Sequence, residues 1–350
     1  MTVNVTKPQL NFREENSSLK QVVGLKGAEL MRADTNEDVF NALGGMAPFR
    51  NKVINGDCSV WQRGTSFSIS SGAYTLDRFI MYFQGGPAAV SKQTDNYVGT
   101  YASVTVPHID CQFTQFIENN ENWIYDKPVT VSFLIRSSTM SSAWVKIYNQ
   151  GTSTTIGQYK YNIGPTWTRV VQTFPASTAW NAGNHVRVYF MTNSNVTGSF
   201  DITQLQVETG SQATPFERRP FQVEYQLCQR YYQTSYAIGV AAGTNYSNNC
   251  YKGENFISWN AAVPAWSNIP YSINFPVEMR IVPTVATYGV NLGTAGKAGG
   301  TYCASNTDGL ALYGTNSTTK SIGLYAGGGG LSAPSEGNWA ANWTANAEIT

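Results

Sequence analysis

The stretch Val129-Thr-Val-Ser-Phe-Leu-Ile-Arg136 decides the fold class of this chain. Two parities are evident along it: Val129, Val131, Phe133 and Ile135 on one, and Thr130, Ser132 and Arg136 on the other. Successive side chains of a β-strand point to opposite faces, so this alternation predicts a strand with one face in a core. An antiparallel sandwich has strands of this kind.

The same period of two recurs elsewhere between residues 51 and 219. Val186, Val188 and Phe190 alternate with Arg187, Tyr189 and Met191, and Val145 and Ile147 alternate with Trp144, Lys146 and Tyr148. Turn residues rich in Gly, Asn and Pro separate these runs, as in residues 85–87, 150–151 and 164–165. We therefore expect an all-β fold, an antiparallel jelly-roll β-sandwich with two sheets of about four or five strands each.

One strand near the end of this region changes phase. Phe200 and Ile202 share one parity, whereas Leu205 and Val207 share the other. Side chains swap faces when one extra residue enters a strand, so we predict a β-bulge around Thr203 or Gln204.

A short helix is expected to join the sandwich to a second β-rich domain. Pro220 suits a first helical position, and Val223, Leu227 and Tyr231 recur every fourth residue, which predicts a helical joint over residues 220–233. Arg218 or Arg219 is expected to pair with an acid. Residues 234–350 form the second domain, with strands expected at 255–259, 272–275, 283–290, 310–313 and 321–325, and with glycine-rich loop tips at 289–300 and 327–330.

Residues 1–50 differ from the rest because charged side chains are concentrated there. Thr35 with Asp38 and then Val39, Phe40, Leu43 and Gly44 predicts a short capped helix. A helix this short needs a partner for its apolar face. We interpret the segment as an N-terminal arm that anchors the chain to another protein, or alternatively as a flexible tail. The anchoring candidates are its apolar residues Phe12, Leu19, Leu30, Val39, Phe40 and Leu43.

Composition excludes several classes of function. Charged residues make up 13% of the chain, against roughly 25% in ordinary soluble domains. The net charge is +1 and no run of Lys and Arg occurs, so a nucleic-acid partner is not expected. Neither a secretory signal nor an apolar stretch long enough for membrane insertion is found, which predicts synthesis in a host cytoplasm.

The sequence offers no pattern for a metal or another cofactor. The five cysteines, Cys58, Cys111, Cys228, Cys250 and Cys303, are widely spaced and are expected to be buried free thiols. The two histidines, His108 and His185, are too few for a histidine-rich metal site and are expected at surface or strand-end positions.

Three motifs resemble a known protein family, and the first and last of them bracket the sandwich. NGDCSVWQRG spans residues 55–64, YTLDRF spans 74–79, and QLQVETGSQATPFERRPFQVEYQLCQRYYQ spans 204–233. Their order and separation resemble a β-sandwich module of bacteriophage tail-fibre and virion structural proteins. Residues 275–285 and 343–349 also resemble the C-terminal part of phage tail proteins.

The resemblance implies a non-enzymatic virion protein of a tailed bacteriophage. The leading hypothesis is a tail fibre or tail-associated receptor-binding protein that recognises host surface polysaccharide. The alternative is a capsid decoration or head-fibre protein anchored by residues 1–50. Fibres of this kind are commonly homotrimers, so the expected partners are further copies of the chain, another virion protein and host glycans.

A polysaccharide-cleaving tailspike is the lesser alternative. Glycoside hydrolysis needs two suitably separated carboxylates, and the candidates are Asp57, Asp77, Asp95, Asp110, Glu118, Glu121 and Asp126. Parallel β-helix repeats, which such spikes commonly have, are missing. Asp57 and Asp77 lie inside the motifs and are expected to tie a loop to a strand end or to pair with Arg63 or Arg78.

Aromatic side chains are the remaining source of ligand-binding chemistry. The chain has 9 tryptophans and 20 tyrosines, whose flat apolar faces match the C–H face of a sugar ring. Most are expected in the core. The better ligand candidates lie beside polar turn residues and are Trp180, Trp266 and Trp339.

Overall fold

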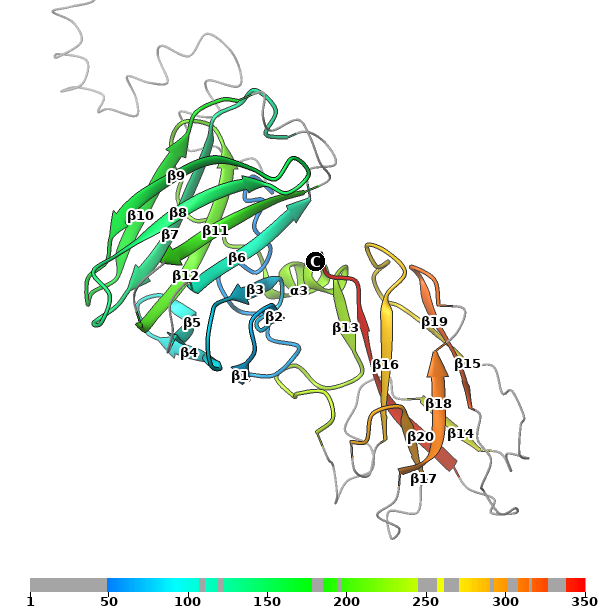
Figure 1. Cartoon of the computed structure of the whole chain (residues 1–350). Coiled ribbons are helices and arrows are strands. Elements are labelled where there is room, and N and C mark those ends of the chain that lie inside the picture. The colour runs from blue at the N-terminus through cyan, green and yellow to red at the C-terminus, as the bar shows by residue number, and fades with distance from the viewer. Residues whose placement is uncertain are drawn as a thin grey trace, which may run out of the picture.

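The computed structural model confirms an all-β protein with antiparallel sheets (Figure 1). It describes residues 49–106, 111–118, 123–177, 185–193, 197–244, 257–260, 271–289, 293–300, 308–314, 317–326 and 338–349. The predicted arm and its helix, including Phe12, Leu19, Leu30, Val39, Phe40 and Leu43, lie outside these residues.

Two six-stranded sheets form the sandwich within the described residues. Sheet A has the order β1-β4-β5-β12-β7-β10, and sheet B has the order β2-β3-β6-β11-β8-β9. The strands of sheet A are β1 (Ser66–Ile69), β4 (Ala88–Asp95), β5 (Gly99–Val106), β7 (Val129–Arg136), β10 (Thr168–Phe174) and β12 (Gly198–Thr209). Those of sheet B are β2 (Ala73–Tyr74), β3 (Phe79–Tyr82), β6 (Cys111–Glu118), β8 (Ser142–Asn149), β9 (Thr154–Asn162) and β11 (His185–Asn193).

The sheets are larger than the four or five strands expected from the sequence. The reason is the length of the first strands, because β1 has four residues and β2 has two. The two residues of β2 cannot show an alternation, and the Ser-Phe-Ser-Ile alternation of β1 has the minimum length for a strand pattern.

The sandwich core lies where the alternation predicts it. Val131, Phe133 and Ile135 of β7 face Val145 and Ile147 of β8 across one buried cluster. The β-bulge is confirmed, since the register of β12 against β7 shifts between Thr203 and Gln206 and Gln204 has a φ of 52°. Met191 was expected on the outer parity of β11 but is fully buried, because a second register shift follows Tyr189.

A further sheet of eight strands follows sheets A and B in the chain, and we call it the second sheet because it belongs to the second β-rich part. Its strands are β13 (Tyr232–Thr234), β14 (Ile257–Asn260), β15 (Tyr271–Asn274), β16 (Thr284–Gly289), β17 (Lys297–Gly300), β18 (Asp308–Gly314), β19 (Ser321–Ala326) and β20 (Asn338–Asn346). All five strands predicted in this region are present. The stretch 289–300 was expected to be a loop, but its end forms β17.

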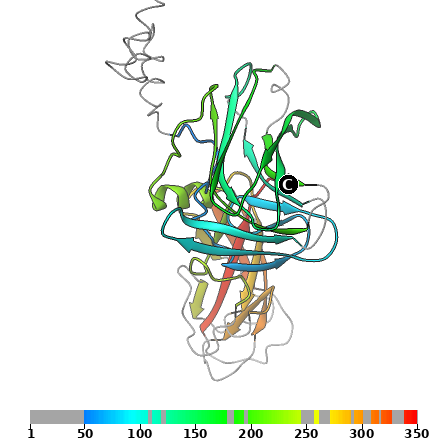
Figure 2. The same cartoon turned by 90° about the vertical axis from the view of Figure 1, so that its left-hand side faces the viewer.

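Helix α3 (Phe221–Gln229) lies between the sandwich and the second sheet in the view of Figure 1 and at one side of the molecule in the view of Figure 2. It ends four residues earlier than predicted because Tyr232 pairs with Asn346 of β20. Pro220 is its N-cap rather than its first residue. The predicted stripe of Val223 and Leu227 is only half-buried, and the buried residues of the helix are Glu224 and Cys228.

No helix among the described residues is both long and apolar enough to cross a membrane. Cys58, Cys111 and Cys228 are buried free thiols, as predicted, whereas Cys250 and Cys303 lie outside the described residues.

Candidate functional site

A cluster of motif residues connects the sandwich, α3 and the C-terminal segment. We call it the joint and define it as Gln62, Arg63, Asp77, Arg78, Arg219, Glu224, Tyr231, Tyr232 and Glu348. The Asp77 carboxylate accepts hydrogen bonds from the Gln62 backbone N–H at 2.6 Å and from Gln62 Nε2 at 2.7 Å. Arg63 Nη1 lies 3.4 Å from Asp77 Oδ1, and Arg63 Nη2 lies 3.1 Å from Glu348 Oε1. Arg78 Nη1 also pairs with Glu348. The predicted pairing of Asp77 with Arg63 is therefore confirmed.

Aromatic rings cover both arginines of this joint. The Arg78 guanidinium carbon lies 3.4 Å from the Tyr231 ring centroid, and that of Arg63 lies 3.7 Å from the Tyr232 centroid. A desolvated guanidinium is stabilised by a ring face. Because both tyrosines follow α3 directly, these stacks fix the helix against the sandwich.

Glu224 extends the joint on the other side of α3. Its carboxylate lies 3.3 Å from Arg219 Nη1 and accepts a hydrogen bond from the Asn55 backbone N–H. Arg219 is thus the arginine that pairs with an acid, as expected of one of the two, whereas Arg218 lies over the Phe216 ring. The hydrogen bond from Asn55 to the Glu224 carboxylate therefore connects the motif at 55–64 to the motif at 204–233.

Burial dominates the acid–base properties of the joint. It raises the pKa of Asp77 to about 6, although Arg63 and the Gln62 hydrogen bonds oppose the rise. It also raises the pKa of Glu224 against the effect of Arg219. The Asp77 side chain has no exposed surface and that of Glu224 very little, so neither carboxyl group can reach a polymer in solvent.

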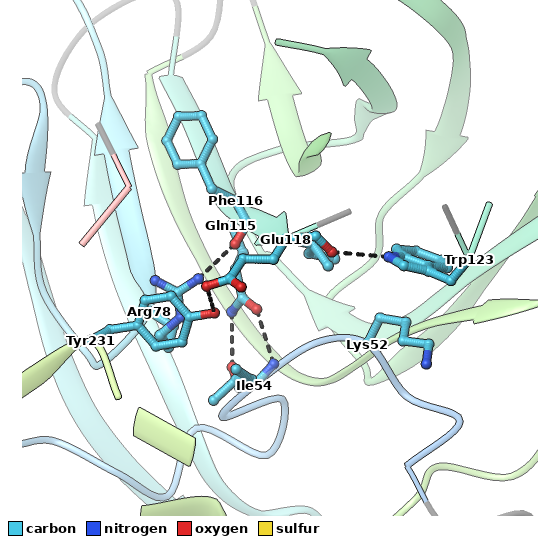
Figure 3. A pocket seen from close by; sticks show the side chains of 9 residues that line it. Lys52, Ile54, Arg78, Gln115, Phe116, Glu118, Trp123 and Tyr231 are labelled. Carbon is cyan, nitrogen blue, oxygen red and sulfur yellow. Dashed lines mark hydrogen bonds between the residues drawn. The ribbon is translucent and has the colours of Figure 1, made fainter. Parts of the chain in front are cut away.

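A small hollow lies beside the joint (Figure 3). It has a volume of about 220 Å³, and Figure 3 shows Arg78, Glu118 and Tyr231 directed toward one another at its edge. Tyr231 donates to Glu118 at 2.8 Å, and Arg230 Nη2 lies 3.2 Å from the same carboxylate. Burial opposes ionisation of Glu118, but these two partners outweigh it and lower its pKa. Gln115, Glu118 and Tyr231 at this hollow have partners within the chain, whereas Arg78 Nε is buried without a hydrogen-bond partner among the described residues.

The outer face of sheet B, unlike the joint, carries aromatic and cationic side chains without paired acids among the described residues. Val186, Val188, Val145 and Ile147 point into the core, so the residues between them point outward. Cross-strand neighbours share a face, and they arrange the outward residues of β11, β8 and β9 in rows. One row holds Tyr189, Lys146 and Gln158, the next holds Arg187, Tyr148 and Thr155, and Trp144 pairs with Lys160.

The tyrosine rings of this face lie close to the side chains of Lys146 and Arg187. Tyr148 and Tyr189 form an edge-to-face pair with centroids 6.5 Å apart, and Lys146 Nζ lies 5.1 Å from each ring. The Arg187 guanidinium carbon lies 4.1 Å from the Tyr82 ring centroid and 4.5 Å from that of Tyr189. Trp144, Tyr148 and Tyr82 are half-buried and keep part of each side chain in solvent.

The C-terminal segment covers only one side of this face. Ile80 and Phe116 pack beneath Tyr231 and Ile349 in a cluster of their own. Tyr74 donates to the Ile349 carbonyl. Tyr82 packs against that cluster, and the Arg187 guanidinium carbon lies 5.1 Å from the Phe116 ring centroid. We define the aromatic–cationic face as Arg187, Lys146, Tyr148, Trp144, Tyr82, Tyr189 and Lys160.

No model of a known protein family matches the chain, and no curated protein does. Solved structures overlap with part of it. A structure described as "CBM4 structure and function" is 20% identical, covers 45% of this chain and 98% of its own, and has a TM-score of 0.34. The C-terminal family 22 carbohydrate binding module of Clostridium thermocellum Xyn10B is 15% identical, with coverages of 41% and 99% and a TM-score of 0.30.

A phage protein also overlaps with this chain. The enzymatically active domain of tailspike protein 4 of bacteriophage CBA120 is 16% identical, covers 47% of this chain and 22% of its own, and has a TM-score of 0.30. All three overlaps span less than half of the present chain. The fold class rests on the strand pairing described above.

The three predicted ligand residues are not brought together in the described part of the chain. Trp180 and Trp266 lie outside the described residues. Trp339 lies in β20, where it pairs in register with Trp259 of β14. Its role in ligand binding stays a prediction.

The predicted carboxylates are likewise dispersed. Asp57 accepts a hydrogen bond from the Ser59 backbone N–H and so closes a loop, as expected. Asp95 accepts from Trp167 Nε1 at 3.0 Å, and the Val98 N–H and Trp167 lower its pKa. Asp126 lies in an exposed turn, and Asp110 and Glu121 lie outside the described residues. No group of three or more metal-ligating side chains occurs among the residues that the structure describes.

The aromatic–cationic face was missed by sequence reasoning, although its signal is present. Trp144, Lys146 and Tyr148 form the polar parity of β8, and Arg187 and Tyr189 form that of β11. An outward parity with three rings out of five positions is unusual for a surface that meets only water. The pairing of the two strands was needed to bring these residues together. His185 begins β11, as a strand-end position was expected for it, whereas His108 lies outside the described residues.

Proposed function

We propose that this protein is a non-enzymatic structural protein of a tailed bacteriophage particle, a tail fibre or tail-associated protein that binds host surface polysaccharide. The aromatic–cationic face is the binding surface. The observation that carries the proposal is the register of β11, β8 and β9, which places the half-buried Tyr148 and Trp144 on the outer side of sheet B beside the buried Tyr189 ring.

The chemistry of this face suits a sugar polymer. Ring faces stack on the C–H faces of pyranoses, and side-chain amides and hydroxyls bond to sugar hydroxyls. Gln112 lies beside Arg187 on the same face, and Gln158 lies beside Lys146. A flat sheet face also accommodates an extended chain better than an enclosed pocket would.

The acid–base properties of the described carboxyl groups support binding rather than cleavage. A glycosidase needs an accessible carboxyl group with a raised pKa as its general acid. Among the described carboxyl groups, Asp77 and Glu224 have raised pKa values, and both are buried in the joint. Glu118, at the end of β6, has a lowered pKa instead.

The joint supports a structural role in a particle. The motifs at 55–64, 74–79 and 204–233, which resemble those of phage virion proteins, form a charged and stacked connection between two β-rich parts. Such a connection keeps the parts in one orientation. If the chain forms the homotrimer that the resemblance implies, three faces bind one polysaccharide surface together, and avidity compensates for weak single sites.

A microarray of bacterial surface polysaccharides tests the proposal. The full-length protein should bind a subset of the spots, and Trp144→Ala should weaken binding about threefold to tenfold per site, as expected for one aromatic contact. Trp167→Ala is the matched control, because Trp167 is half-buried on sheet A and bonds to Asp95. No binding by the wild-type protein, or equal losses in both variants, would contradict the proposal.

Particle location requires a separate experiment. A tail protein is present in few copies per particle, whereas a capsid decoration protein is present in many. Quantitative mass spectrometry of purified particles should find few copies. A chain lacking residues 1–50 should fold and yet fail to join particles if these residues are the anchoring arm.

A further inference from the structure

Charge is distributed differently over the two sheets of the sandwich. The strands of sheet A hold three cations, Lys92, Arg136 and Arg169, and three acids, Asp95, Asp201 and Glu208. Those of sheet B hold the cations Lys146, Lys160 and Arg187 and the single acid Glu118 at the end of β6. Sheet B therefore has an excess of positive charge in a chain whose net charge is +1.

Arg136 of sheet A and Arg187 of sheet B have different partners, whereas Arg169 of sheet A donates to the Thr214 carbonyl and the Ser132 hydroxyl. On sheet A, Arg136 Nε lies 2.8 Å from Asp201 Oδ2. On sheet B, Arg187 donates only to neutral groups, with Nη2 3.2 Å from Gln112 Oε1 and Nε 3.3 Å from Thr114 Oγ1. No described carboxylate makes an ion pair with Arg187, Lys146 or Lys160.

The three cations of sheet B lie on one diagonal. Arg187 is the cross-strand partner of Tyr148, and Lys146 is two residues before Tyr148 on the same face. Lys160 is the partner of Trp144, and Lys146 is two residues after Trp144. Arg187, Lys146 and Lys160 therefore step across β11, β8 and β9, and diagonal neighbours on a sheet lie about 7–8 Å apart.

Aromatic rings flank this line on both sides. Tyr148 and Tyr189 lie on opposite sides of the step from Arg187 to Lys146, and Trp144 lies beside the step from Lys146 to Lys160. Burial lowers the pKa of the Arg187 guanidinium, whereas the neighbouring tyrosines oppose this effect. Holding a half-buried cation without a counter-ion costs free energy, and an anionic ligand would recover it.

We propose that the aromatic–cationic face recognises an acidic polysaccharide, with the carboxylates of its sugars along the line Arg187–Lys146–Lys160 and its rings on Tyr148 and Trp144. This inference rests on the proposed glycan-binding function and specifies its ligand class. A regular row of cations fits a polymer with anionic groups at regular intervals, and neutral sugars would leave all three cations without an ion pair to any carboxylate that the structure describes. Electrostatic attraction also accelerates encounter with a negatively charged cell surface.

Chemically matched polymers test the inference. Polygalacturonate, alginate and hyaluronate are each compared with their carboxyl-reduced forms, which keep the backbone and lose the charge. The full-length protein should bind at least one acidic form about tenfold more tightly than its reduced form, and added salt should remove most of the difference. Binding is measured by affinity electrophoresis and by titration calorimetry.

Substitutions test whether Arg187, Lys146 and Lys160 cause the preference for the acidic polymer. Lys160→Gln should weaken binding to the acidic polymer about twofold to fivefold, as expected for one exposed charge pair. Replacing Arg187, Lys146 and Lys160 together by Gln should abolish the preference for the acidic form. Lys127→Gln is the control, because Lys127 is an exposed lysine away from this face, and it should change nothing. A melting curve of each variant shows that it is folded.

The possible failures are distinguishable. If the protein binds neutral glycans on the microarray but shows no preference for any acidic polymer, the inference is overturned and the proposed function stands. If the preference exists but survives the triple substitution, the cation line is not its origin and the inference is again overturned. If the protein binds no glycan in either experiment, both the inference and the proposed function fail.

Discussion

Arg78 and Glu348 are 270 residues apart in the chain and form an ion pair in which each side chain is only 1% exposed. Arg78 also donates to the Phe116 carbonyl at 2.7 Å, and its guanidinium lies against the Tyr231 ring. The first strands of the sandwich, the residue after α3 and the C-terminal end of the chain thus meet at one side chain. The joint makes the sandwich and the second sheet depend on each other for stability.

Removing the Glu348 carboxylate should strongly lower the free energy of unfolding. Glu348→Gln leaves Arg78 buried without its counter-ion, while Arg63 keeps only Asp77, and loss of one partner of a buried pair costs about 3–5 kcal/mol. Urea denaturation of the full chain measures the change in the free energy of unfolding. Glu278→Gln is the control, because Glu278 pairs with Lys320 at 3.9 Å on the surface and both side chains are exposed. The control should change stability by less than about 1 kcal/mol. Equal effects of the two substitutions would show that the joint does not stabilise the chain.

Substitution of Gly56, in the motif at 55–64, tests the close packing of this motif against β12. A Cβ atom at Gly56 would lie 2.2 Å from the Leu205 carbonyl oxygen, whose residue donates its N–H to the Gly56 carbonyl at 2.8 Å. Gly56→Ala should therefore push the loop away from the bulge of β12 and destabilise the protein by about 1–3 kcal/mol. Gly164→Ala meets no atom within 4 Å and should be neutral or slightly stabilising. Thermal unfolding followed by circular dichroism compares them, and a neutral Gly56→Ala would contradict the close packing described here.

The pKa of Asp77 predicts a pH dependence with a definite sign. Burial raises this pKa from 3.8 to about 6 in the folded protein. Between these two values the folded state keeps the proton while the unfolded state loses it, so the contribution of Asp77 to stability falls as the pH rises from about 4 to 6. Asp77→Asn removes this titration. The difference in unfolding free energy between wild type and variant should thus favour wild type most at pH 4 and change little above pH 7. A difference that grows with rising pH would show that the pKa is lowered instead.

The sandwich could be predicted from sequence because several of its strands contain clear alternating runs. Val129 to Arg136 and Val186 to Phe190 each place apolar residues on one face, and even the bulge near Gln204 was evident as a change of parity. The helix end was predicted less well. Helical periodicity continues to Tyr231, but the pairing of Tyr232 with Asn346 is a long-range contact that overrides it.

The central strand of the second sheet was missed for a physical reason. Strand β20 reads NWAANWTAN and pairs with β13, β14, β16 and β17. Asn342 and Thr344 are buried in it, and Asn342 accepts a hydrogen bond from Ser235. Trp339, Ala341, Trp343 and Ala345 do share one parity, but six of the nine residues are Asn or Ala, which have low strand propensity, and the polar parity is buried as well. The ion pair of Arg78 with Glu348 was unpredictable for a different reason, since only the folded chain brings them together.

The central claim is that the outer face of sheet B binds polysaccharide. Hydroxyl-radical footprinting with mass spectrometry tests it most directly, because the method reads the solvent exposure of single aromatic side chains with and without a bound polymer. With a polysaccharide that the protein binds, oxidation of Trp144 and Tyr148 should fall severalfold, whereas Trp167 on sheet A and Tyr97, which is 78% exposed, should react as before. Protection of Trp167 or Tyr97 with no change at Trp144 and Tyr148 would contradict the account.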